Sequence, residues 1–78
     1  FGATRSEVTL GGVEFVVFHT PERAEVIRMG YLSRPARAAV PELMVRAAEQ
    51  VTGCKVRPNS VKTLIPGDTG EARMSLSC

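Results

Sequence analysis

The stretch SRPARAAVPELMVRAAEQVTGCKV, residues 33–56, carries the pattern that decides the fold of this 78-residue chain. Its apolar residues recur at helical spacing and form one stripe, made of Ala36, Val40, Leu43, Met44, Ala47 and Val51. Ser33 can cap the first turn, where Pro35 is tolerated because the first N–H groups of a helix have no intrahelical partner. Gly53 suits the left-handed cap that ends a helix. The pattern predicts one helix that begins at Pro35 and ends before Gly53.

Pro41 lies inside this predicted helix. A proline in a helix interior removes one hydrogen bond and clashes with the carbonyl four residues earlier, at a cost of about 3 kcal/mol. Either the helix kinks at Pro41, or residues 35–40 form a separate short turn and the main helix starts near Pro41. The apolar stripe continues through the proline, which favours the single kinked helix.

Two β-like segments, residues 4–10 (TRSEVTL) and 13–20 (VEFVVFHT), open the chain. The second is rich in Val and Phe, as strands prefer. The two glycines between them can both adopt positive φ, which predicts a hairpin in which Leu10 faces Val13. The second segment is mostly apolar on both faces, which favours a central strand.

Residues 24–32 (AEVIRMGYL) follow a turn that has Pro21 at its second position. A helix over residues 22–29 is the alternative for this segment. Gly30 and two β-branched residues disfavour a helix, so we predict a third strand.

The end of the chain is predicted to be a hairpin. The segment 66–70 (PGDTG) is a strong turn signal. Residues 71–78 alternate cleanly, as expected for a strand with one buried and one solvated face. Pairing around the turn would place Ile65 opposite Glu71.

These elements predict an α+β fold for a single small domain, residues 1–78. We expect an antiparallel sheet of about five strands in the chain order β-β-β-α-β-β, with one helix packed on one face. The helix stripe would meet an inner sheet face drawn from Phe15, Val17, Ile65, Met74 and Leu76. The sequence leaves open which face of the second and third strands turns inward.

The two cysteines, Cys54 and Cys78, come into register if the first arm of the last hairpin contains an excursion of about four residues near Pro58. Both thiols are then expected to point inward, so we predict a Cys54–Cys78 disulfide. It would close a loop of about 25 residues and stabilise the chain by about 3–4 kcal/mol. Reduced, buried cysteines remain an alternative. A redox or metal pair lacks C-x-x-C spacing and an evident activating cation.

The charge of the chain is weakly basic, at +2, with ten Lys and Arg distributed along the sequence. This distribution favours a mixed solvated surface over a nucleic-acid footprint. If the helix and the following strand brought part of the set to one edge, a basic patch would form from Arg34, Arg37, Arg46, Lys55, Arg57 and Lys62. A small intracellular nucleic-acid-associated domain is therefore the alternative function.

No pattern for catalysis, cofactor binding or metal binding is recognisable. His19 is the only histidine, and it has no partner at ligand or triad spacing. Asp68-Thr69-Gly70 is similar to the catalytic turn of aspartic proteases, but those enzymes need two such aspartates, and a hairpin turn explains it here. No apolar run is long enough to span a bilayer. The chain begins at Phe1 rather than Met, which suggests a mature or excised form.

The segment QVTGCKV (residues 50–56), Gly67-Asp68 and the ending ARMSLSC resemble small uncharacterised secreted or lipoprotein-like domains of proteobacteria. Their pattern is a helix ending in Thr-Gly-Cys, followed by a hairpin ending in Cys. The resemblance implies an envelope location and a paired cysteine, and it implies no activity. We therefore expect a non-catalytic periplasmic or secreted module that supports or binds an unknown protein partner.

Overall fold

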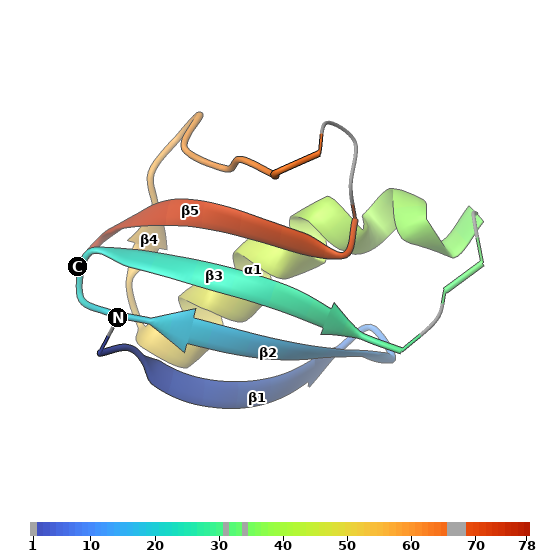
Figure 1. Cartoon of the computed structure of the whole chain (residues 1–78), viewed down its shortest axis with the longest axis horizontal. Helices are drawn as coiled ribbons and strands as arrows, with labels where there is room; N and C mark the ends of the chain where they lie inside the picture. Colours follow the sequence, from blue (N-terminus) through green and yellow to red (C-terminus); the bar gives the residue numbers. More distant parts are fainter. Residues whose placement is uncertain (1, 31, 34, 66–68) are drawn as a thin grey trace.

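The computed structural model describes residues 2–30, 32–33, 35–65 and 69–78. Its elements are β1 (Thr4–Leu10), β2 (Val13–His19), β3 (Arg23–Met29), a 3-10 turn η1 (Pro35–Ala39), α1 (Val40–Thr52), β4 (Lys55–Val56) and β5 (Glu71–Ser77). The strands form one antiparallel sheet in the spatial order β1-β2-β3-β5-β4, and α1 crosses one face (Figure 1). The predicted α+β fold, with the chain order β-β-β-α-β-β, is confirmed.

The first hairpin forms as its glycines predict. Gly11 and Gly12 have φ angles of 58° and 78°, the region that a two-residue hairpin loop requires and that glycine enters without steric cost. Leu10 pairs with Val13. β2 lies between β1 and β3, so the prediction of a central strand is confirmed.

The third segment is a strand, as predicted, but it ends at Met29 instead of residue 32. Gly30 follows with a φ of 82°, and this left-handed conformation turns the chain out of the extended path. The inner face of β3 carries Ala24 and Val26, both buried, while Met29 is exposed.

The start of the helix differs from the prediction. The single kinked helix is wrong, because residues 35–39 form η1 and Pro41 is the second residue of α1, where proline interrupts no helical hydrogen bond. Ala36 is exposed and takes no part in the apolar stripe. Ser33 does not cap α1, because the cap position is Ala39, which makes no side-chain bond. The Ser33 carbonyl instead accepts a hydrogen bond from the Arg37 N–H at 3.2 Å.

The end of the helix is built by backbone and side-chain bonds together. Gly53 has a φ of 72° and donates its N–H to the carbonyl of Glu49 at 2.9 Å, as the predicted left-handed cap requires. The Thr52 hydroxyl accepts the N–H of Cys54 at 3.1 Å. The Glu49 carboxylate accepts the N–H of Val56 at 2.9 Å. These bonds determine the direction in which the chain leaves the helix at Cys54 and the point at which β4 begins.

The core lies between α1 and the sheet face that it covers. Its buried residues are Val13, Phe15, Val17, Ala24, Val26, Val40, Met44, Ala47, Ala48, Cys54, Ala72, Met74 and Leu76. Ile65 was predicted in this core and is 67% exposed. The segment that leads to Ile65 pairs with β5 only as far as a bridge between Lys62 and Arg73. Ile65 therefore lies beyond the residues that are paired with β5.

The predicted disulfide is present in the structure. The Cα atoms of Cys54 and Cys78 are 4.4 Å apart, and β4 pairs with β5 in the register that continues to these two residues. Lys62 pairs with Arg73, so the excursion between this bridge and β4 is three residues rather than four. Cys54 is buried, but Cys78 is exposed, because it lies past the last residue of β5.

Candidate functional site

The sheet face that α1 leaves uncovered is called the open face here. Because side chains alternate along each strand, it carries the residues that lie between the core residues in the sequence of each strand and point away from the core. It consists of Arg5, Glu7, Thr9, Glu14, Val16, Phe18, Arg23, Glu25, Ile27, Met29, Glu71, Arg73 and Ser75. Among the described residues, no helix covers this face (Figure 1).

An apolar strip runs through the middle of the open face. Val16 pairs with Ile27 across β2 and β3, and Phe18 lies two residues further along β2. Val16 is buried, whereas Ile27 and Phe18 are half-buried. The strip is bordered by arginine and glutamate side chains of both signs, as the alternating sequence predicts for a solvated sheet face.

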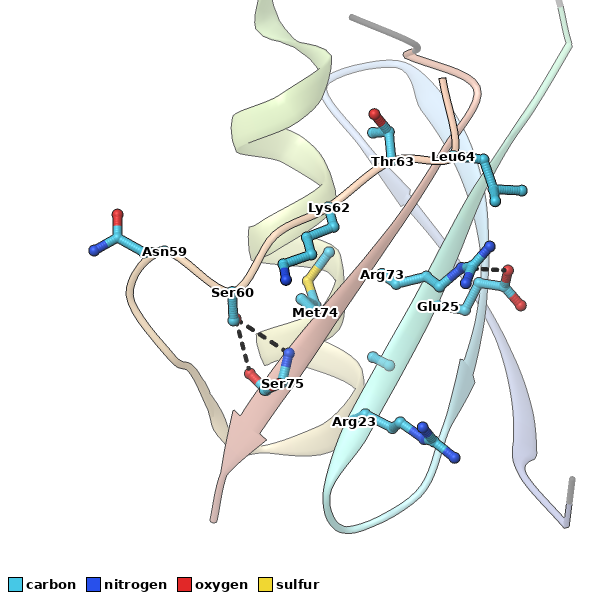
Figure 2. Close-up of a pocket in the computed structure, with 11 residues that line it drawn as sticks. Arg23, Glu25, Asn59, Ser60, Lys62, Thr63, Leu64, Arg73, Met74 and Ser75 are labelled. Carbon is cyan, nitrogen blue, oxygen red and sulfur yellow. Dashed lines mark hydrogen bonds and ion pairs between the residues drawn. The ribbon is translucent and has the colours of Figure 1, made fainter. Parts of the chain in front are cut away.

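A groove of about 830 Å³ lies where segment 59–64 runs beside β5, and residues of β3, on the other side of β5, complete its lining (Figure 2). Arg23, Glu25, Lys62 and Arg73 give it three cations and one carboxylate. The Nε of Arg73 lies 3.8 Å from a carboxylate oxygen of Glu25. This exposed contact is loose and contributes little to stability.

Ser60 holds segment 59–64 against the sheet. Its hydroxyl oxygen lies 2.7 Å from the carbonyl of Arg57, to which it donates, and it accepts the N–H of Ser75 at 3.1 Å. Asn59, just before it, has a φ of 62°, a conformation that asparagine tolerates better than most residues. Lys62 exchanges two backbone hydrogen bonds with Arg73, both at 2.8 Å. The segment is therefore an interrupted continuation of β4.

We expect Ser60→Ala to lower the free energy of unfolding by about 1–3 kcal/mol, because the N–H of Ser75 loses its acceptor in a part-buried position. Denaturant unfolding followed by circular dichroism measures this difference. Ser77→Ala is the matched control, because Ser77 is exposed at the end of β5, and it should change stability by less than about 0.5 kcal/mol. Equal losses in the two variants would contradict the role of Ser60.

The described residues of the predicted basic patch do not gather at one place, because they lie before, within and after α1. Arg37 is in η1, before the helix, and its Nε donates to the carbonyl of Leu32 at 3.0 Å. Lys55 is in β4, after the helix. The intervening α1 has 13 residues and is roughly 20 Å long. Arg37 and Lys55 are therefore not neighbours.

The other members of the set have separate surroundings. Arg46 is exposed on α1, and Lys62 lines the groove. Arg57 directs its Nε to the carbonyl of Leu76 at 3.3 Å, across the β4–β5 pair. Arg34 lies outside the described residues. Lys55 and Arg57 both follow α1, in β4 and just after it, whereas Arg37 lies before the other end of α1.

His19 is the remaining candidate for chemistry. Its Nε2 lies 3.1 Å from the hydroxyl of Ser6 on the neighbouring strand, in a part-buried position. Within the described residues, no three His, Cys, Asp or Glu side chains gather as metal ligands. Asp68 of the protease-like turn lies outside the described residues. Among the helices of the described residues, none is long and apolar enough to cross a membrane.

Comparison with protein-family models, curated proteins and solved structures finds no significant match to this chain. The candidate site is therefore defined by its geometry alone, as the groove and the exposed apolar residues beside it. Leu64 is 71% exposed, and Val61 and Ile65 are exposed with it. The sequence prediction places Ile65 in the core and assigns no surface to Val61 and Leu64, so it does not identify these residues as one exposed apolar group.

Proposed function

We propose that this chain is a non-catalytic module of the cell envelope, periplasmic or secreted, that binds a protein partner. The observation that carries the proposal is the Cys54–Cys78 disulfide. Disulfides persist mainly in oxidising compartments, and small domains use them where the hydrophobic core alone is marginal. A covalent link between the end of the helix and the end of the chain suits a module that must remain folded outside the cytoplasm.

The partner is proposed to bind at segment 59–65 and the groove beside it. Val61, Leu64 and Ile65 offer apolar area that binding would remove from water. Lys62 and Arg73 lie next to them and line the groove. This combination suits a protein surface with apolar side chains and an acidic border, because interfaces combine an apolar centre with a polar rim.

The test uses the full gene product in its own host. Cells are treated with a thiol-alkylating reagent before and after reduction, and the envelope and cytoplasmic fractions are separated. We expect the chain in the envelope fraction, with Cys54 and Cys78 alkylated only after reduction. A cytoplasmic chain that is alkylated without reduction would overturn the proposal.

The binding surface is tested on the same protein by capture from envelope extract. We expect the doubly substituted variant Leu64→Glu, Ile65→Glu to lose the partner that the wild-type chain retains. The matched control is Ala36→Glu, Ala38→Glu, which introduces the same charges at exposed positions of η1 and should retain it. Equal capture by both variants would exclude segment 59–65 as the binding surface.

A further inference from the structure

β1 forms one edge of the sheet and pairs only with β2 among the residues that the structure describes. An edge strand exposes unpaired N–H and C=O groups, and proteins usually protect such an edge with proline, charged side chains (lysine above all), a bulge or a short strand. The opposite edge is blunted in this way, because β4 has two residues and is followed by Pro58 and the left-handed Asn59. β1 has seven regularly paired residues without proline, and its exposed charged side chains, Arg5 and Glu7, have opposite signs.

The hairpin determines which backbone groups of β1 point away from the sheet. Leu10 and Val13 close a two-residue loop, and the closing pair of such a hairpin is hydrogen-bonded. Hydrogen-bonded and non-hydrogen-bonded pairs alternate along an antiparallel ladder. The backbone groups of Arg5, Glu7 and Thr9 are therefore directed to the free edge.

The side chains of β1 are complementary to a second copy of the same strand. Arg5 and Glu7 lie on the open face, with side chains 53% and 68% exposed, and they form an ion pair at 2.7 Å. In a two-fold antiparallel pairing centred on Ser6, Arg5 of each copy lies opposite Glu7 of the other. Centring on Arg5 or on Glu7 instead would place like charges opposite each other, which is unfavourable. A shift by one residue would exchange the two faces.

We propose that β1 pairs antiparallel with β1 of a second copy of this chain, in the register centred on Ser6. The pairing joins the two sheets into one, with both α1 helices on the same side. Thr4 then faces Val8 of the second copy, and such β-branched residues suit cross-strand pairs. The proposal uses a different edge from segment 59–65 and does not depend on the envelope location.

The dimer is expected to form reversibly, because one pair of edge strands buries less surface than the roughly 1,200–2,000 Å² of a stable interface. Sedimentation of the disulfide-bonded chain over a wide concentration range should show the mass rising from monomer to dimer. Arg5→Glu alone, or Glu7→Arg alone, should raise the dimer dissociation constant about tenfold or more, because each variant places like charges opposite each other in both halves of the interface. The double variant Arg5→Glu, Glu7→Arg should restore the wild-type constant.

Mixing the two single variants provides an independent test. One variant then offers two carboxylates and the other two guanidinium groups, so we expect a mixed dimer at concentrations where each alone is monomeric. Arg46→Glu on α1 is the control and should leave the constant unchanged, and thermal unfolding verifies that every variant is folded. A monomer at every concentration, or a dimer that ignores the charge exchange, would overturn the proposal. Neither result bears on segment 59–65.

Discussion

The double variant Cys54→Ala, Cys78→Ala is expected to lose about 3–4 kcal/mol of unfolding free energy relative to the oxidised wild-type chain. The bridge joins residues that are 24 positions apart, and closing a loop of this size restricts the unfolded chain by about that amount on the chain-entropy model. A domain of 78 residues has roughly 4–12 kcal/mol of stability in total, so the loss is a large fraction of it. Denaturant unfolding of purified protein measures the difference.

The single variant Cys78→Ala gives the control for this prediction. Cys78 is exposed, so its replacement removes the bridge with little change in packing, although it leaves a free thiol at the buried Cys54. We expect it to lose nearly as much stability as the double variant, because either substitution opens the same loop. Reduced wild-type protein should behave similarly. A double variant within about 1 kcal/mol of the wild type would contradict a stabilising role for the bridge.

Phe15→Ala is expected to lower the free energy of unfolding by about 3–5 kcal/mol. Phe15 is 1% exposed and is among the largest fully buried side chains of the core between β2 and α1, so its removal leaves a cavity that the helix cannot easily fill. Thermal and denaturant unfolding of the oxidised protein measure the change. We expect the variant to be partly unfolded at physiological temperature, because the remaining stability of so small a domain is low.

Phe18→Ala is the matched control, with the same substitution on the opposite face of the same strand. Phe18 is half-buried on the open face, where no helix covers it in the described structure, so its removal creates no enclosed cavity. We expect a loss of less than half that of Phe15→Ala. Equal losses would mean that the open face is covered in solution, for example by another protein surface.

The sheet could be predicted from the sequence where local and long-range preferences agree. The glycine pair at positions 11 and 12 has one favourable turn geometry, and the alternation on both sides then determines the register of the hairpin. Alternation also identified the buried face of β5. The cysteines added long-range information, because only one register brings Cys54 to Cys78.

The start of the helix and the groove could not be predicted in the same way. Periodicity treats Ala36 and Val40 alike, but only Val40 is covered by the sheet, so the apolar stripe extended too far toward Pro35. Segment 59–65 depends on contacts made after folding, such as the bond between Ser60 and Ser75. Pro58 and Asn59 did indicate an excursion near that point.

The position of β5 in the sheet has a consequence for the order in which the strands can pair during synthesis. β5 is the last of the described strands in the sequence, yet it lies between β3 and β4, so neither of them has this neighbour until β5 has been synthesised. Its pairing with β3 joins residues such as Glu25 and Arg73, which are far apart in sequence, and pairings of this kind form slowly. Until then one edge of β3 is unpaired, and the core lacks the side chains of Ala72, Met74 and Leu76. We therefore expect the sheet to close only after residues 71–77 have been synthesised, when β5 enters between β3 and β4.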